Sequence, residues 1–366
     1  MTFEEVRAQE KRSMMPVFAR FPVALVSGRS ATAKGIDGKE YVDFTAGIGV
    51  NSLGYCDPEW VRAVSGQAAA LQHSSNLYYS PVQTAAAEKL CKLSGLSKVF
   101  FGNSGAEANE GAVKLARKYG TERLGPGRTH IVTLKNSFHG RTVTTLAATG
   151  QDEFHASFMP LTEGFSYAEP SMESIESCVS DKTCAVMLEL IQGEGGVVPM
   201  DKAFVKALRA FCTERRLLMI VDEVQTGVGR TGAFYCYQNY GVLPDVVTSA
   251  KGIASGLPLG ACLCAEPLAD VLGPGTHGST FGGNPVVCAG ALVVLDRLAK
   301  PEFLKGVREM GAYFAERLRR MPGITSVRGM GLMLGAKPAS GDPAAIAAKC
   351  AGQGLLILPA MPGFYH

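Results

Sequence analysis

Short apolar runs alternate with amphipathic stretches through the middle of the chain. Five runs of strand length occur there, and polar or glycine-rich segments follow them. Between the first two runs, Ala108, Ala112, Leu115 and Tyr119 fall on one side of a helix. Strand and helix therefore alternate from about residue 98 to 265, which predicts an α/β fold with a mostly parallel, covered sheet. The five runs are residues 98–101, 130–134, 184–189, 217–221 and 245–250.

The flanking segments follow a different pattern. Residues 1–20 are expected to form a helical arm, and residues 21–49 a set of strands and hairpins. A chain of 366 residues is too long for one compact core, so we expect two domains or one large domain with an appendage. Residues 359–366 show no periodic pattern. The remaining predicted elements are helices at 59–71, 81–93, 286–298, 303–320 and 343–351, and strands near 324–327, 331–335 and 355–358.

The composition excludes several classes of protein. Hydrophobic residues make up 46% of the chain, which argues against disorder, and the net charge of +3 indicates neither a nucleic-acid partner nor a membrane partner. The N-terminus has no apolar signal region, and no stretch has the length and apolarity of a membrane span. The ten cysteines lack metal-ligand spacing, and Cys262 and Cys264 are expected on one face of a buried strand. We therefore expect a cytoplasmic protein.

An acid and a lysine follow two of the predicted strands. Asp222 comes directly after the run at 217–221, and Lys251 follows the run at 245–250. Ligands of open α/β sheets bind beyond the carboxyl ends of the strands. Pyridoxal phosphate (PLP) needs this pair, because a lysine forms its Schiff base and a carboxylate keeps its ring nitrogen protonated. Taken alone, Lys251 is also compatible with an ordinary surface lysine after a strand.

Other strand ends carry side chains that suit anions and planar rings. Ser104 and Glu107 match a capping box, and the small residues beside them leave backbone N–H groups open for a phosphate. In the next loop, Phe138 or His139 can cover a planar ring, and Arg141 can bind a carboxylate. A structural helix start and a solvated basic loop remain the alternatives. The hydroxyl- and glycine-rich segment at 275–285 is compatible with an anion site or a plain loop.

One motif is interpreted as incidental. Residues 227–232 (GVGRTG) match the dinucleotide-binding pattern GxGxxG. The pattern requires a following helix and an acidic residue about twenty positions later, and neither is evident here. A nicotinamide-dependent enzyme is therefore disfavoured.

Taken together, these motifs resemble the class III (subgroup II) PLP-dependent aminotransferases of fold type I, and among them the acetylornithine aminotransferases. The similarity runs from Arg20 to about Leu358. It implies a mostly parallel central sheet flanked by helices, with a smaller α/β domain built from both ends of the chain. The implied parts are an arm and small-domain segment at 1–58, a PLP-binding domain at 59–285 and a small-domain segment at 286–366. The matching motifs are residues 103–109, 138–142, 192–196, 222–227, 251–252 and 279–285.

The resemblance also implies roles for individual residues around PLP. Lys251 would bind PLP and move the proton in catalysis, Asp222 would pair with the ring nitrogen and Phe138 would stack on the ring. Gln225 would bond the ring hydroxyl oxygen. Thr280 would reach the phosphate bound in a neighbouring subunit, which implies a homodimer with shared sites. The cofactor-binding residues implied in this way are Ser104, Gly105, Ala106, Phe138, Asp222, Glu223, Val224, Gln225, Lys251 and Thr280.

Three further residues are implied in binding amino-acid substrates. Arg141 would bind a substrate carboxylate, Ser279 would contact an acetylornithine-type substrate, and Glu194 would pair with a carboxylate-binding arginine. Ornithine aminotransferases carry a tyrosine where this sequence has Ile48, which favours acetylornithine as the amino donor and 2-oxoglutarate as the acceptor. Succinylornithine and related diamines remain alternatives.

The sequence departs from the family pattern at three places. Leu190 replaces a usual proline, and Tyr55 replaces a usual histidine. Relatives also continue into a strand that supplies an arginine for the α-carboxylate of glutamate, whereas no arginine follows Arg328 here. Either the sequence is truncated, or the protein lacks that strand and binds PLP with impaired activity.

Overall fold

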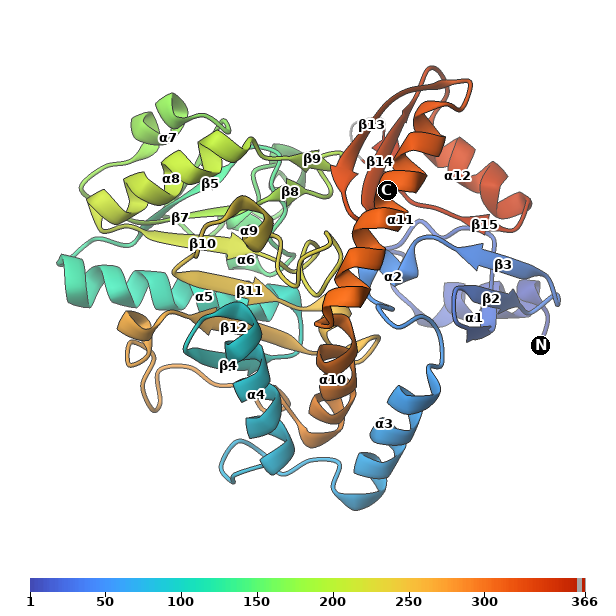
Figure 1. The fold of residues 1–366 in the computed structure, drawn as a ribbon, viewed down its shortest axis with the longest axis horizontal. Helices are drawn as coiled ribbons and strands as arrows, with labels where there is room; N and C mark the ends of the chain where they lie inside the picture. The colour runs from blue at the N-terminus through green and yellow to red at the C-terminus, as the bar shows by residue number, and fades with distance from the viewer. Residues whose placement is uncertain (361–363, 366) are drawn as a thin grey trace.

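A seven-stranded sheet forms the centre of the molecule (Figure 1). This computed structural model describes residues 1–360 and 364–365. The strand order is β4-β12-β11-β10-β7-β5-β6; β12 runs antiparallel to both of its neighbours, and the other pairs are parallel. The predicted α/β fold with a mostly parallel sheet is therefore confirmed. The strands are β4 Lys98–Gly102, β5 His130–Leu134, β6 Phe165–Ala168, β7 Thr183–Glu189, β10 Leu218–Asp222, β11 Val246–Ser249 and β12 Gly260–Cys264.

Helices bury both faces of this sheet. Along β10, Leu218 and Ile220 pack with α5 on one face, whereas Met219 and Val221 pack on the opposite face with α4, α8 and α10. Since successive side chains of a strand point to opposite faces, a continuously apolar strand requires a cover on both sides. The helices are α1 Phe3–Ser13, α2 Ala46–Gly49, α3 Pro58–Ala70, α4 Pro81–Ser94, α5 Gly105–Tyr119, α6 Val143–Ala148, α7 Met172–Cys178, α8 Lys202–Arg215, α9 Tyr237–Tyr240, α10 Pro285–Leu298, α11 Pro301–Arg319 and α12 Pro343–Gly352.

Side-chain caps fix the starts of many helices. Asp57, Ser80, Asn284 and Asp342 each accept a backbone hydrogen bond, and each is followed by a proline at the first helical position. Proline is favoured there because its fixed φ suits the helix and its missing N–H would have no partner. Asp201 likewise caps α8, with Phe204 N donating to its Oδ1 at 2.9 Å.

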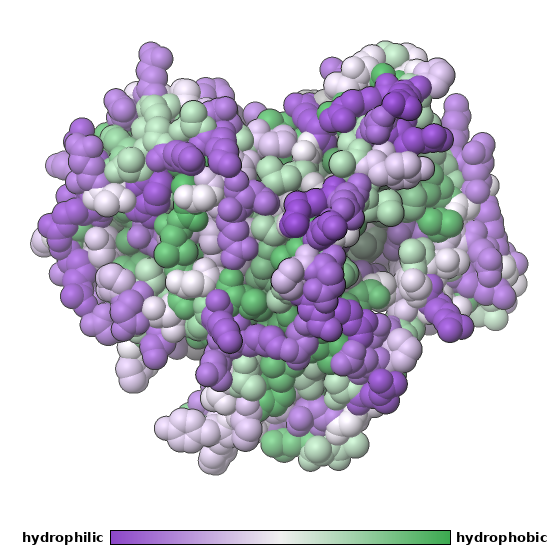
Figure 2. All heavy atoms as spheres, viewed as in Figure 1, coloured by the Kyte–Doolittle hydropathy of each residue, from purple (hydrophilic) through white to green (hydrophobic). Residues whose placement is uncertain are grey.

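Both ends of the chain meet in a smaller layer beside the central sheet. β15 pairs in parallel with β3, which places Leu355 opposite Val42. The visible face is mostly hydrophilic and is hollowed between this part and the rest of the molecule (Figure 2). The strands outside the central sheet are β1 Leu25–Arg29, β2 Thr32–Gly35, β3 Glu40–Asp43, β8 Ile191–Gln192, β9 Val198–Pro199, β13 Ile324–Met330, β14 Met333–Pro338, β15 Leu355–Leu356, β16 Pro359–Ala360 and β17 Phe364–Tyr365.

Several boundaries differ from the sequence-based expectations. The N-terminal arm is helical only over Phe3–Ser13, because the residue before Pro16 disfavours the helical conformation. The helix α5 is followed directly by a π-helical turn over Gly120–Leu124. Residues 359–360 and 364–365 pair as β16 and β17 where no pattern was expected, whereas residues 361–363 and 366 lie outside the described part.

One simpler expectation is confirmed. Cys262 and Cys264 are both buried on the α5 face of β12. Within residues 1–360 and 364–365, no helix combines the length and apolarity needed to cross a bilayer.

Candidate active site

A cleft of about 470 Å³ opens at the carboxyl ends of the parallel strands. The segments that follow β4, β5, β7, β10 and β11 all contribute to its wall, as expected for strands that end at one edge of a sheet. The structure therefore brings together residues as far apart in the sequence as Val50 and Leu259. Of the predicted site residues, those lining the cleft are Ser104, Gly105, Ala106, Phe138, Arg141, Glu194, Asp222, Val224, Gln225 and Lys251.

Asp222 accepts hydrogen bonds from three separate elements. Its Oδ2 lies 2.8 Å from Asn109 Nδ2 on α5 and 2.8 Å from His139 Nδ1 in the β5 loop. Its Oδ1 accepts from the backbone N–H of Val224 at 3.0 Å. Asp222, Asn109 and His139 are all nearly inaccessible to solvent. The carboxylate is therefore held in one orientation, and His139 serves as its partner rather than as the ring cover considered from the sequence.

Lys251 lies at the first position of a short 3-10 turn, Lys251–Ala254. Its φ of 44° is in the left-handed region, which is costly for a residue with a side chain and is found disproportionately at functional sites. Burial lowers the pKa of Lys251, and Arg230 lowers it further, whereas Glu194, Asp222 and Glu189 act in the opposite direction. A lysine with a lowered pKa has more of its amine uncharged near neutral pH than an ordinary surface lysine, and only the uncharged amine can act as a nucleophile or base.

The start of α5 presents open backbone donors to the cleft. Gly105 and Ala106 line the cleft, and their N–H groups donate no hydrogen bond within the described residues. A Cβ added to Gly105 would lie 2.7 Å from Val224 Cγ1, so only glycine fits between α5 and the β10 loop. A helix N-terminus of this kind is suited to a phosphate group.

The expected capping box at this helix is only half formed. Ser104 Oγ accepts from Glu107 N at 3.2 Å, as predicted. Glu107 Oε2, however, accepts from the backbone N–H of Asn103 at 2.5 Å and from its side chain at 2.8 Å, rather than from Ser104 N. The acid therefore binds one residue earlier than a capping box requires, because the chain bends at Asn103 toward the start of the helix.

Two aromatic rings position Arg141. Its guanidinium carbon lies 4.1 Å from the ring centre of Phe154 and 5.3 Å from that of Phe138. Stacking of this type orients the planar group and leaves its N–H donors free for a carboxylate.

Glu189 was not predicted as a site residue. Its carboxylate accepts from Phe138 N at 2.8 Å and from Gly193 N at 3.3 Å, so it joins two of the loops that form the cleft. Burial raises the pKa of Glu189 to about 7. Its position as the last residue of β7 was the available signal, because the neighbouring strand β10 ends with Asp222 in register with it.

Three predicted site residues do not line the cleft. Glu223 is fully buried on the far side of the β10 turn, where it accepts from Thr226 Oγ1 at 2.6 Å and Tyr237 N at 2.9 Å. Ser279 lies next to the cleft, since its Oγ accepts from Asn103 Nδ2 at 3.2 Å. Thr280 is exposed on the surface.

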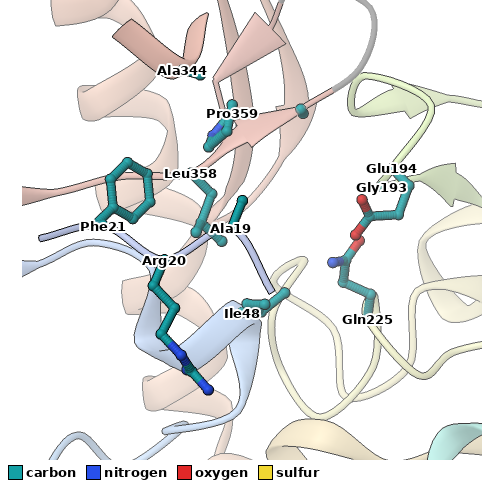
Figure 3. A pocket seen from close by; sticks show the side chains of 11 residues that line it. Ala19, Arg20, Phe21, Ile48, Gly193, Glu194, Gln225, Ala344, Leu358 and Pro359 are labelled. Atoms are coloured by element: carbon teal, nitrogen blue, oxygen red, sulfur yellow. The ribbon is translucent and has the colours of Figure 1, made fainter. Parts of the chain in front are cut away.

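A second cavity, of about 440 Å³, adjoins the cleft and shares Glu194 and Gln225 with it. These two side chains extend toward one another in Figure 3, and Ile48 faces them across the cavity. Arg20 also lines this cavity, but its guanidinium group points away from Glu194 and donates to Glu10 Oε1 at 2.5 Å. The cavity provides room for a substrate chain that extends from the cleft.

Comparisons with known proteins agree with this geometry. The family model "Aminotransferase class-III" matches residues 15–363. An acetylornithine aminotransferase of Haemophilus ducreyi is 45% identical to the chain, over 98% of this chain and 92% of the relative. One of Methanocaldococcus jannaschii is 46% identical over 90% of this chain and 84% of the relative.

Two solved structures show the same architecture. The ornithine aminotransferase of Toxoplasma gondii superposes with a TM-score of 0.95 at 32% identity, covering 100% of this chain and 89% of that one. The N-acetylornithine aminotransferase of Stenotrophomonas maltophilia superposes with a TM-score of 0.82 at 35% identity, covering 98% and 91%. The predicted aminotransferase fold is therefore confirmed.

Proposed function

The chain belongs to the class-III aminotransferase family, and we propose that it transfers the δ-amino group of N2-acetylornithine to 2-oxoglutarate. The observation that carries this proposal is the placement of Lys251 and Asp222 in one cleft, beside the open N-terminus of α5. The relatives of similar sequence that act on acetylornithine direct the choice of substrate. Such a reaction belongs to arginine biosynthesis.

The residues of the cleft fit PLP as the cofactor. The open N–H groups of Gly105 and Ala106 would bind its phosphate, and Asp222 would bind its protonated ring nitrogen. Gln225 would donate to the ring hydroxyl oxygen, and Phe138 would stack on the ring. Gly105 packs against Val224 with no space for a Cβ, which fixes the helix start that would present these N–H groups. When bound, the cofactor supplies an electron sink for the broken C–H bond of the substrate.

The protein's own groups would manage the proton. Burial lowers the pKa of Lys251, so its amine can accept the proton from Cα or Cδ of the substrate. The same amine would then donate this proton in the next proton-transfer step. Asn109 and His139 hold Asp222 in the orientation that the ring nitrogen requires. The buried wall around these groups excludes water from the transferred proton.

Arg141, Glu194 and Ser279 would select the substrate. Arg141 is oriented by its aromatic neighbours to bind a carboxylate in bidentate fashion. Glu194 lies between the cleft and the second cavity, where it can influence which substrate side chain enters that cavity. Ile48 gives that cavity an apolar wall, which suits an acylated amine better than a second charged amine.

We further propose a homodimer with shared active sites. Leu77, Tyr78, Tyr79 and Phe281 are large apolar residues that are more than 60% exposed in the single chain. Thr280 lies beside Phe281 on this surface, and Asn76 Nδ2 donates to the backbone oxygen of Ser279 at 2.9 Å, which ties the two segments together. A patch of this kind is typical of an interface.

A cytoplasmic location is supported by the cysteines. All ten lie within the described residues and are free thiols, as expected in a reducing compartment.

Amino-donor competition tests the substrate proposal. Purified enzyme is given 2-oxoglutarate with N2-acetylornithine, N2-succinylornithine or ornithine, and glutamate formation is followed. We expect kcat/KM to be highest for acetylornithine. A preference for succinylornithine would reassign the acyl group, and a preference for free ornithine would contradict the proposal.

A further inference from the structure

Residues 45–54 form a strained loop beside the active-site lysine. Ala46, Gly47, Ile48 and Gly49 all have positive φ values, of 47°, 64°, 64° and 74°. The left-handed conformation is unfavourable for each residue with a side chain, and a β-branched residue such as Ile48 is an outlier there. A conformation of this kind persists only when its surroundings hold it in place.

One buried carboxylate holds both ends of this loop. Asp43 Oδ1 accepts from Thr45 N at 2.8 Å, Thr45 Oγ1 at 2.7 Å and Ala46 N at 3.2 Å. Asp43 Oδ2 accepts from the hydroxyl of Tyr55 at 2.7 Å. The carboxylate therefore contacts the residue before the left-handed turn, the first residue of that turn and the residue that follows the loop.

Tyr55 is itself fixed in place. Its backbone N–H and C=O pair with those of Ser30 at 2.7 and 2.9 Å. A Cβ added at Gly28 would lie 2.5 Å from the Tyr55 ring, so the ring packs directly on the backbone of β1. The hydroxyl is thus presented to Asp43 by a rigid support.

The loop 45–54 also fixes the 3-10 turn that begins at Lys251. Ser52 Oγ donates to Gly252 O at 2.7 Å, and Leu53 N donates to Ser255 Oγ at 3.2 Å. Both contacts fall within four residues of Lys251, whose own φ is in the left-handed region.

We propose that Asp43 and Tyr55 are positioning residues, which fix the loop 45–54 and, through Ser52 and Leu53, the backbone turn of Lys251. The inference rests on the proposed function, because it takes Lys251 as the reactive lysine. Neither residue touches the cleft, so both act through the loop.

The test compares Tyr55→Phe, Ser52→Ala and the double variant with the wild-type holoenzyme. Tyr41→Phe is the matched control, because Tyr41 is buried in the same sheet and its hydroxyl bonds none of the described residues. The first readout is kcat with acetylornithine. The second is the pH midpoint of Lys251 acylation by acetic anhydride in the full chain before cofactor is added, measured by mass spectrometry of the Lys251 peptide.

We expect Tyr55→Phe to lower kcat by about tenfold, since a charge-assisted hydrogen bond is lost. The acylation midpoint should rise by roughly half a pH unit as the looser turn admits water to the amine. Glu194, Asp222, Glu189 and Arg230 also act on Lys251 and are unchanged in every variant. The double variant should resemble the single variants, because the two side chains act in series.

Two results would overturn the inference. If Tyr55→Phe and Tyr41→Phe have the same kcat and the same acylation midpoint, a positioning role is excluded. A Tyr55→Phe variant with a lower melting temperature but an unchanged acylation midpoint would also exclude it. Asp43→Asn provides a second variant if Tyr55→Phe does not fold. A wild-type enzyme inactive on acetylornithine would contradict the proposed function alone, because the acylation midpoint would still report the position of Lys251.

Discussion

The Nδ1 atom of His139 lies 2.8 Å from Oδ2 of Asp222, and both side chains are buried. The histidine comes from the loop after β5 and the aspartate from the end of β10, so the contact joins two separate strand ends. Asn109 on α5 binds the same oxygen. The cleft therefore contains a carboxylate whose direction is set by three elements before any ligand binds.

Replacement of Asp222 by asparagine should lower kcat by about 10²- to 10⁴-fold, because an amide cannot carry the charge that the cofactor ring nitrogen needs. Steady-state turnover measures this. Asp270→Asn, which removes a surface carboxylate paired with Arg123, is the control and should leave kcat unchanged. Near-normal turnover of Asp222→Asn would show that the carboxylate has another role.

Substitution of Gly105 by alanine should weaken cofactor binding by about tenfold or more, because the new Cβ would lie 2.7 Å from Val224 Cγ1 and displace the helix start. The dissociation constant is measured by titration of the cofactor-free chain. Val224→Ala removes the clash, so Gly105→Ala should cost much less in that background. An equal loss in both backgrounds would contradict the steric explanation.

Replacement of Arg141 by lysine should raise KM for the amino donor by about 10- to 100-fold with little change in cofactor affinity, since bidentate binding of a carboxylate is lost. Phe154→Leu removes the ring that lies 4.1 Å from the guanidinium carbon and should raise KM by a smaller factor. Substrate titrations give both values. A fall in kcat with unchanged KM would instead place Arg141 in the chemical step.

The buried acid Glu223 should make stability depend on pH. Burial raises its pKa from 4.5 to about 7, so the folded state favours the protonated form. The stability that it contributes is therefore complete below about pH 4.5 and is lost as the pH rises through 7. Glu223→Gln removes this titration, and its stability relative to wild type should improve between pH 5 and 8 by on the order of 2 kcal/mol. Denaturant unfolding at several pH values measures the difference, and a constant difference would contradict the assignment.

Much of the cleft could be predicted because the ends of strands can be recognised in the sequence. Asp222 and Lys251 each follow a short apolar run, and parallel strands end at one edge of a sheet. The antiparallel direction of β12 could not be predicted from the same pattern, because alternation of apolar residues does not specify strand direction. The roles of the residues around Asp222 could not be predicted from the sequence either.

Glu223 illustrates this limit, since it directly follows Asp222 yet points away from the cleft. The direction of a side chain beyond a strand end depends on the turn that follows, which is set by contacts such as that with Tyr237. His139 and Glu189 have partners far away in sequence, so their function in orienting the cleft emerged only from the fold. The left-handed turn at 46–49 likewise depends on Asp43 and has only its two glycines as a local signal.

We propose that Lys251 carries an aminotransferase reaction between acetylornithine and 2-oxoglutarate. An absorbance spectrum of the purified holoenzyme, recorded before and after addition of acetylornithine and then of 2-oxoglutarate, tests it most directly. We expect a cofactor band that is lost with the amino donor and restored by the acceptor, and that is absent or unresponsive in Lys251→Ala. A wild-type band that never responds to acetylornithine, or a Lys251→Ala variant that cycles like wild type, would contradict it.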